Sequence, residues 1–204
     1  MLFLGITGGV GAGKSEILSF IEKNYRARVM RSDEMAHDIM EPGTDCNRKL
    51  QELFAGDGVF AADGVINRPR LAEVIFGDDR KREALNAVVH PAVKEAILFE
   101  EKKERGAGNL DLLVLEAALL IEEGYGAICD ELWYIHTSEN NRRERLMRSR
   151  GYSEKKVQSI FDSQLPEAVY RENCRAVIDN NGSPEEAFAQ IERELGRRGI
   201  RRIC

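Results

Sequence analysis

The chain has 204 residues, of which 43% are hydrophobic and 32% charged, and its formal net charge at pH 7 is -5. This length suits one buried α/β core with an insertion, and the negative charge offers no global attraction to nucleic acid or to an anionic membrane. No apolar run approaches the roughly 18 residues of a membrane span. The cysteines, at positions 46, 129, 174 and 204, form no Cys-x-x-Cys pair, and the chain start lacks a basic leader. We therefore expect reduced thiols and a cytoplasmic protein.

The first seventeen residues carry the clearest motif. An apolar run at residues 2–6 predicts a strand, which leads into Thr7-Gly8-Gly9-Val10-Gly11-Ala12-Gly13-Lys14-Ser15. This spacing, between a strand and a helix, is typical of a phosphate-binding loop, and an incidental glycine-rich turn is disfavoured because every part of the context agrees. The glycines let backbone N–H groups face a phosphate, Lys14 supplies charge for the outer phosphates, and the Ser15 hydroxyl is placed to bind Mg²⁺. The motif predicts a nucleoside triphosphate site.

A strand-end carboxylate follows soon after this loop. Apolar residues at helical spacing predict a helix over residues 14–24, and residues 28–30 predict a second strand that ends just before Asp33. Ligands of open parallel sheets lie outside the carboxyl ends of the strands, so Asp33 is placed to share a crevice with the loop. The alternative is that Asp33 caps a helix over residues 34–37.

Residues 42–105 form a helical pattern broken by turns, which we interpret as an insertion between the second and third strands. Its arginines include Arg68, and His90-Pro91 predicts the start of a further helix over residues 92–104. A histidine in such a place is more often a capping or packed residue than a catalytic one.

The third predicted strand, residues 110–115, ends in Glu116. A carboxylate at the end of a core strand beside a phosphate loop is the usual group for holding Mg²⁺ or its water shell, and the alternative is an acidic residue that begins a turn. Residues 119–124 predict a short helical lip over the crevice. A fourth strand is predicted at residues 131–135.

An arginine-rich helix follows the fourth strand, with five arginines between residues 142 and 150. It is either a solvated, salt-bridged surface helix or a lid that closes over a triphosphate, and the phosphate loop favours the lid. A second helix is predicted from residue 152 through Gln164.

Residues 175–179 predict a fifth strand, and the turn after it, Asn180-Asn181-Gly182, can reach a base edge. Ser183 and the acids after it predict the last helix. The basic tail, which contains Arg197, Arg198, Arg201 and Arg202, reads as helix-end charge rather than a nucleic-acid arm, since no aromatic residues are interleaved.

Five strands that alternate with helices predict an α/β fold, with a parallel sheet and helices on both of its faces. A triphosphate site, a strand-end acid and a basic lid favour phosphoryl transfer to a small acceptor. Asp33 would accept the acceptor hydroxyl's proton, while Lys14, Mg²⁺ on Ser15 and the lid arginines would neutralise charge on the transferred group.

The chain also resembles one enzyme family along nearly its whole length. The matching segments, in chain order, are Gly5 to Ser15, Ser32 to His37, Asn67-Arg68, Leu71-Ala72, Val74 to Phe76, His90-Pro91, Glu116 to Glu122, Arg145-Leu146, Arg150, Gln164 and Ile178 to Gly182. This ordered set resembles dephospho-CoA kinase and is far more specific than the phosphate loop alone.

The resemblance implies ATP-dependent phosphorylation of the ribose 3′-hydroxyl of dephospho-CoA, the last step of coenzyme A synthesis. It implies a P-loop, nucleoside-monophosphate-kinase-like domain over residues 1–204, with its core at 1–40, 106–138 and 166–204, a CoA-binding insertion at about 41–105 and a lid at about 139–165. By the same resemblance, residues that bind the ATP phosphates or the nucleotide are Gly9, Val10, Gly11, Ala12, Gly13, Lys14, Ser15 and Asn180. Asp33 is the expected general base and Arg145 a lid arginine. The expected acceptor side contains His37, Arg68, His90 and Glu116.

Three positions depart from the residues that are most common in that family. Arg31 stands where a further Asp is frequent, Glu116-Ala117-Ala118 replaces Asp-x-Pro, and Arg142 stands where Gln is common.

Three alternatives remain: a related kinase for another nucleotide or small alcohol, a GTP-binding switch protein, and an inactive ATP-binding module. The chain lacks the Asn-Lys-x-Asp motif that reads guanine, and it keeps Lys14, Ser15 and Asp33. We expect ATP and dephospho-CoA as ligands, and a monomer or small homo-oligomer.

Overall fold

The computed structural model describes residues 1–117 and 119–203, so Ala118 and Cys204 lie outside the described residues. Contacts between Cα atoms divide the chain into two compact units. The first comprises Met1–Met30 and Lys103–Cys204, and the second comprises Arg31–Lys102. The division into core, insertion and lid that the sequence suggested stays a prediction.

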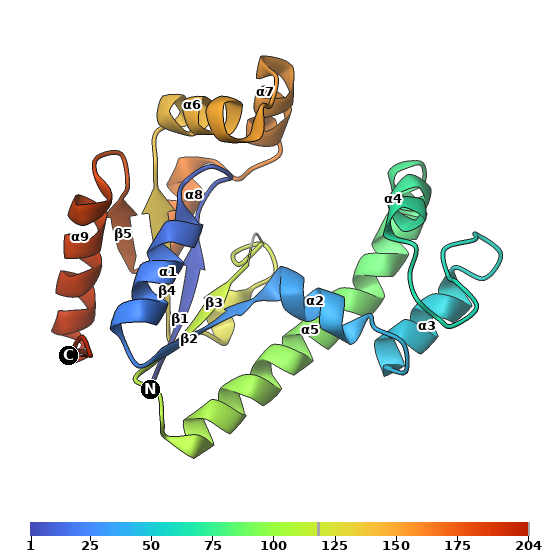
Figure 1. The fold of residues 1–204 in the computed structure, drawn as a ribbon, viewed down its shortest axis with the longest axis horizontal. Helices are drawn as coiled ribbons and strands as arrows, with labels where there is room; N and C mark the ends of the chain where they lie inside the picture. The colour runs from blue at the N-terminus through green and yellow to red at the C-terminus, as the bar shows by residue number, and fades with distance from the viewer. Residues whose placement is uncertain (118, 204) are drawn as a thin grey trace. The chain divides into compact units, whose positions relative to one another are not determined.

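A five-stranded parallel sheet forms the centre of the first unit, as the sequence predicts (Figure 1). Its strands are β1 (Leu2–Thr7), β2 (Ala27–Arg31), β3 (Leu112–Glu116), β4 (Glu131–His136) and β5 (Ala176–Asp179). They lie in the order β2-β3-β1-β4-β5. Strand β1 pairs in parallel with β3 and β4, and β4 pairs in parallel with β5. From β1 the chain runs first to β2 at one edge, then to β3 between them, and then to β4 and β5 on the other side of β1. The loop after β1 therefore leaves the sheet at the switch point where ligands bind in such folds.

One face of the sheet packs against two helices that lie side by side, α1 (Lys14–Asn24) and α9 (Pro184–Arg197) (Figure 1). Alternate strand residues, among them Leu4, Val114 and Trp133, supply this face and are fully buried. Helix α9 begins with a complete capping box at Ser183, so its predicted start is confirmed. Burial of Ile17, Leu18 and Ile21 holds α1 against the sheet, with its first turn next to the loop that precedes it.

The opposite face is covered by α8 (Glu167–Asn173), a helix that the sequence reading missed. The rings of Tyr134 and Tyr170 stack with centroids 4.8 Å apart. Helices therefore cover both faces. The predicted helical lip over residues 119–124 is wrong, because residues 119–124 form turns. Between β3 and β4 the only helical segment among the described residues is a 3₁₀ turn at Tyr125–Ala127. The buried Leu120 points at Gly5 and ties this stretch to the sheet.

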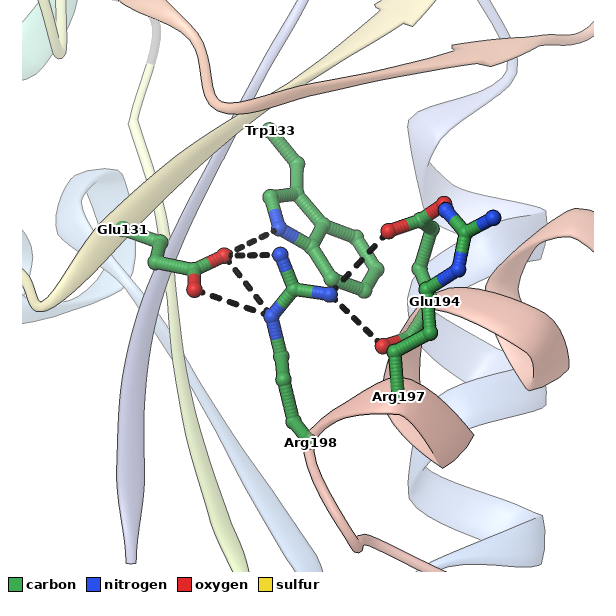
Figure 2. Close-up of polar contacts among 5 residues, drawn as sticks. All are labelled: Glu131, Trp133, Glu194, Arg197 and Arg198. Carbon is green, nitrogen blue, oxygen red and sulfur yellow. Dashed lines mark hydrogen bonds and ion pairs between the residues drawn. The ribbon is translucent and has the colours of Figure 1, made fainter.

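The end of α9 is anchored to the start of β4 by a polar cluster (Figure 2). The Arg198 guanidinium donates to both carboxylate oxygens of Glu131, at 2.9 and 2.8 Å from Nε, and to the backbone carbonyl of Glu194 at 2.6 Å. The indole N–H of Trp133 donates to the same Glu131 carboxylate at 3.0 Å. Part of the basic tail therefore serves to close the fold at the end of the sheet opposite the phosphate loop.

The second unit is helical, and it contains α2 (Ser32–Ile39), α3 (Asp45–Leu53), α4 (Arg68–Phe76) and most of α5 (Asp79–Ala107). The prediction that His90-Pro91 opens a separate helix is wrong, because α5 runs through Pro91 without a break. Proline removes one backbone hydrogen bond and costs about 3 kcal/mol inside a helix. Three residues at helical spacing offset that cost by their burial: Val89, Val93 and Ile97.

Two further helices follow β4: α6 (Glu139–Arg150) and α7 (Glu154–Asp162). Each begins with a serine that accepts a backbone N–H, Ser138 for α6 and Ser153 for α7. The arginine-rich helix is thus confirmed, while α7 ends two residues before the predicted Gln164. Over residues 1–117 and 119–203, none of the helices combines the length and apolar composition that crossing a bilayer requires.

Candidate active site

The phosphate loop occupies the turn between β1 and α1. Gly11 and Gly13 have φ of +83° and +87°, in the left-handed region that favours glycine. Gly13 also holds the capping position of α1 without a side-chain cap. The start of the helix is thus not closed by a capping side chain, and the positive end of the helix dipole faces the loop, which favours an anion there.

Lys14 folds back across this loop. Its Nζ donates to the carbonyl of Gly8 at 2.8 Å and lies 3.9 Å from Oε1 of Glu116. The carboxylate reaches that place because Glu116 ends β3 in register with Ile6 of β1. Ser15 is exposed in the first turn of α1. The structure thus brings Lys14, Ser15 and Glu116 to one edge of the sheet.

Buried polar side chains brace the loop from the far strands. The Asn180 side-chain amide donates to the carbonyl of Ala12 at 2.8 Å, and the Thr137 hydroxyl donates to the same carbonyl at 3.0 Å. Both side chains are almost fully buried, and a Cβ on Gly13 would collide with the Asn180 amide. The sequence reading missed Thr137. Its signal was a polar residue just past the end of an apolar strand, like Asp33 and Asn180.

We call Thr137 and Asn180, with the Ala12 carbonyl that they hold, the loop brace. Arg145 makes hydrogen bonds with this brace. Its Nη2 donates to the carbonyl of Asn180 at 2.9 Å and its Nη1 to that of Ala12 at 3.5 Å. Beside it, between α6 and the turn after β5, lies an open cavity of about 600 Å³. The cavity is lined by Asn141, Glu144, Arg145, Met147, Arg148 and Asn181. Arg145 thus lies between the loop and a cavity of the size of a small ligand.

A second arginine of α6 lies over the start of the loop. The Arg142 guanidinium approaches Gly9 so closely that a Cβ there would collide with it. Its other side stacks on the ring of Phe161 from α7, with Cζ 4.3 Å from the ring centroid. Burial lowers the pKa of Arg142.

The residues expected on the acceptor side belong to the second unit. Asp33 and His37 are both exposed and lie one turn apart on α2, so they share a face of that helix. The alternative that Asp33 caps this helix is wrong, because α2 begins at Ser32 with Arg31 in the capping position. Arg68 begins α4, with Nη2 3.7 Å from the Glu41 carboxylate. His90 lies within α5.

The parallel sheet, the glycine loop at its switch point and the lysine folded over that loop define an α/β P-loop nucleotide-binding protein. The family model for dephospho-CoA kinase matches residues 2–186. The chain belongs to the dephospho-CoA kinase family.

Individual relatives are similar to this protein along nearly the whole chain. A dephospho-CoA kinase from Geobacter sulfurreducens is 33% identical over 192 residues, which cover 94% of this chain and 96% of that protein. One from Geobacillus kaustophilus is 32% identical over 190 residues, or 93% of each protein. A crystal structure of a Thermus thermophilus protein superposes with a TM-score of 0.77 at 28% identity, over 96% of this chain and 97% of that one. A Campylobacter jejuni dephospho-CoA kinase has the same fold, with a TM-score of 0.71 at 18% identity over 97% and 98% of the two chains.

Proposed function

We propose that this protein transfers the γ-phosphate of ATP to the ribose 3′-hydroxyl of dephospho-CoA, giving coenzyme A and ADP. The observation that carries this proposal is an intact phosphate loop, with Lys14 folded over it and Asn180 bracing it, in a chain related to dephospho-CoA kinases over nearly all of its length. The match covers residues 2–186 and so includes the second unit, which contains His37, Arg68 and His90, three of the residues expected on the acceptor side.

ATP would bind with its phosphates on residues Gly9 to Ser15 and its base toward the turn after β5. The cavity beside Asn181 and Arg145 has the volume for a purine ring and offers amide groups to its edge. Lys14 would leave the Gly8 carbonyl and move its charge to the outer phosphates. Asn180 and Arg145 would keep the loop in its anion-binding shape.

Mg²⁺ fits the residues at this edge of the sheet. Mg²⁺ usually binds through one or two protein oxygens together with nucleotide phosphates, so it needs no protein cage. Among the described residues, no cluster of three or more His, Cys, Asp or Glu forms such a cage. The exposed Ser15 hydroxyl would supply one oxygen, and Glu116, beside Lys14, would hold the water shell. The ion would neutralise charge on the phosphates.

Asp33 would serve as the general base. The 3′-oxygen would form a bond to the γ-phosphorus as the bond from that phosphorus to the β–γ bridging oxygen breaks, and the hydroxyl proton would pass to the Asp33 carboxylate. His37, on the same face of α2, would bind the acceptor with Arg68 and His90. The division proposed for these roles is a core at 1–40, 106–138 and 166–204, an acceptor-binding insertion at about 41–105 and a lid at about 139–165.

The setting that we propose is the cytoplasm, with small-molecule partners, no nucleic acid and a monomer or small homo-oligomer. Burial raises the pKa values of Cys129 and Cys174 to about 12, so both thiols stay protonated, and Cys46, Cys129 and Cys174 are free. Unpaired thiols of this kind suit a reducing compartment.

A competition assay over acceptors tests the proposal. Purified protein with ATP and Mg²⁺ is offered dephospho-CoA, nucleoside monophosphates and pantetheine derivatives together, and the products are separated. Preferential phosphorylation of dephospho-CoA is the expected result. Preference for another acceptor would support a related kinase instead, and preference for GTP over ATP would favour the switch protein.

A further inference from the structure

Three of the five arginines of helix α6, at positions 142, 143 and 145, differ in their surroundings. Arg143 is tied to three partners, Glu139, Glu154 and Gln158. Arg145 donates to the backbone carbonyls of the loop brace. Arg142, which precedes both on the helix, shows no hydrogen bond or ion pair from its guanidinium within the described residues, and its Nε is buried without a partner.

Arg142 is partly buried, and burial lowers its pKa although the Glu139 and Glu167 carboxylates act at longer range in the opposite direction. A partly buried guanidinium with no carboxylate in hydrogen-bond contact is unfavourable, because the desolvation of the charge is not fully offset. The surroundings of Arg142 keep it in place all the same. The Phe161 ring supports it from one side, at 4.3 Å from Cζ, and Leu146 of the same helix packs against Gly11. Beside it the Gln164 Oε1, which is also buried and unpartnered, approaches the same side of Gly9. A stacked, unpaired guanidinium held over a phosphate loop is arranged to receive an anion.

The place of Arg142 along the loop decides which phosphate it meets. In P-loop proteins the lysine reaches the outer phosphates. Here the Lys14 ammonium lies at the Gly8 carbonyl, and Arg142 lies over the next residue, Gly9. Arg145 lies at the other end of the loop, at Ala12. The two arginines are therefore directed at different parts of a bound nucleotide.

We propose that Arg142 binds the terminal phosphate of the nucleoside triphosphate, so that it, rather than Arg145, is the arginine of this chain that distinguishes ATP from ADP. This inference rests on the proposed function for the identity of the nucleotide. Arg145 keeps a different task, which is to hold the loop brace and one wall of the adjacent cavity.

The test compares nucleotide affinities in the absence of any acceptor. Arg142→Met keeps the length of the side chain and removes the charge, Arg142→Lys keeps the charge, and Arg143→Met is the matched control, since Arg143 also contacts Phe161, at 5.2 Å. Dissociation constants for ATP and ADP are measured with Mg²⁺ by titration calorimetry. One lost charge-assisted contact predicts ATP binding weaker by about 10- to 100-fold in Arg142→Met, with ADP binding within about threefold of wild type. Arg142→Lys should recover part of the loss, and Arg143→Met should bind both nucleotides normally.

A structural role for Arg142 predicts other outcomes. If Arg142→Met weakens ATP and ADP equally, or lowers the melting temperature of the nucleotide-free protein as its main effect, the inference is overturned. The inference expects the opposite, an unchanged or higher melting temperature, because a partly buried charge without a hydrogen-bonded partner has been removed. Selective loss of ATP binding in a protein that does not phosphorylate dephospho-CoA would leave this inference standing and refute the proposed acceptor. Normal ATP binding by Arg142→Met in an active kinase would refute the inference alone.

Discussion

The side-chain amide of Asn180 donates a hydrogen bond of 2.8 Å to the carbonyl of Ala12, across 168 positions of the chain. This bond connects the turn after β5 to the phosphate loop. The Thr137 hydroxyl reaches the same carbonyl at 3.0 Å, so the loop is held from two strands that lie on the same side of β1. The conformation of the loop therefore depends on residues that are distant in sequence.

Removal of the Asn180 amide should loosen the loop more than it unfolds the protein. In Asn180→Ala the Ala12 carbonyl keeps the Thr137 hydroxyl, so we expect the free energy of unfolding to fall by only about 1 kcal/mol. The affinity for ATP should fall by roughly 10-fold, because the anion site is no longer preorganised. Chemical denaturation and calorimetric titration measure the two effects. A large loss of stability with unchanged affinity would contradict this reading of the brace.

Asp33→Asn tests the general base. We expect the rate of turnover to fall by about 10²- to 10⁴-fold, as is typical of a lost general base, while ATP still binds. The substitution preserves the shape of the side chain, and no capping bond is lost because Asp33 does not cap α2. Steady-state kinetics and an ATP titration give the two readouts. Turnover near the wild-type rate would remove Asp33 from this role.

Lys14→Ala should weaken both ATP binding and turnover, since the ammonium is expected to meet the outer phosphates in the ground state and in the transition state. Its hydrogen bond to the Gly8 carbonyl is partly buried, and the loss of one such bond should lower the free energy of unfolding by only about 1 kcal/mol. The same titration and kinetics apply, with thermal unfolding as the control. A variant that retains both affinity and rate would contradict the phosphate site.

Glu131 gives a prediction on stability against pH. Burial alone would raise its pKa, but the hydrogen bonds from Arg198 and Trp133 outweigh it and lower the pKa below its usual value (Figure 2). A carboxylate with a lowered folded-state pKa adds stability above its unfolded pKa, about 4.3, and that stability is lost as pH falls through the folded value. Wild type should therefore lose more stability than Glu131→Gln on acidification from pH 7 to 3.

The control for this prediction is Glu185→Gln, a carboxylate at the start of the same helix α9 and away from Arg198. At pH 7, Glu131→Gln should be less stable than wild type by roughly 1–3 kcal/mol, because a charge-assisted bond is lost in a partly buried site. Denaturant unfolding at several pH values measures this difference. Parallel acid profiles for wild type and Glu131→Gln would show that the cluster adds no pH-dependent stability.

Local features of the fold could be predicted from the sequence. The strand before the loop and helix α1 follow from contiguous residues, and the predicted bounds of α1, residues 14–24, are those observed. The start of α9 is equally local, because Ser183 and Glu186 cap it by themselves. The strand-end positions of Glu116 and Asn180 follow from the rule that parallel strands present their carboxyl ends at one edge.

Features that depend on tertiary packing could not be predicted from the sequence. Pro91 reads as a helix start, and only the burial of Val93 and Ile97 keeps α5 continuous across it. The spacing of Arg142 and Arg145 puts both on one face of α6, so the sequence does not show which of them meets the phosphate loop at Gly9. The fold places Arg142 there. Thr137 carried too weak a local signal, because a threonine after a strand is common and its partner Ala12 is 125 residues away.

The most direct test of the central claim is to follow ADP release from ATP and Mg²⁺ with and without dephospho-CoA, and to analyse the acceptor by mass spectrometry. The account predicts that dephospho-CoA stimulates ADP release and gains one phosphate, located on the ribose 3′-oxygen. Binding of ATP with dephospho-CoA left unmodified would contradict it.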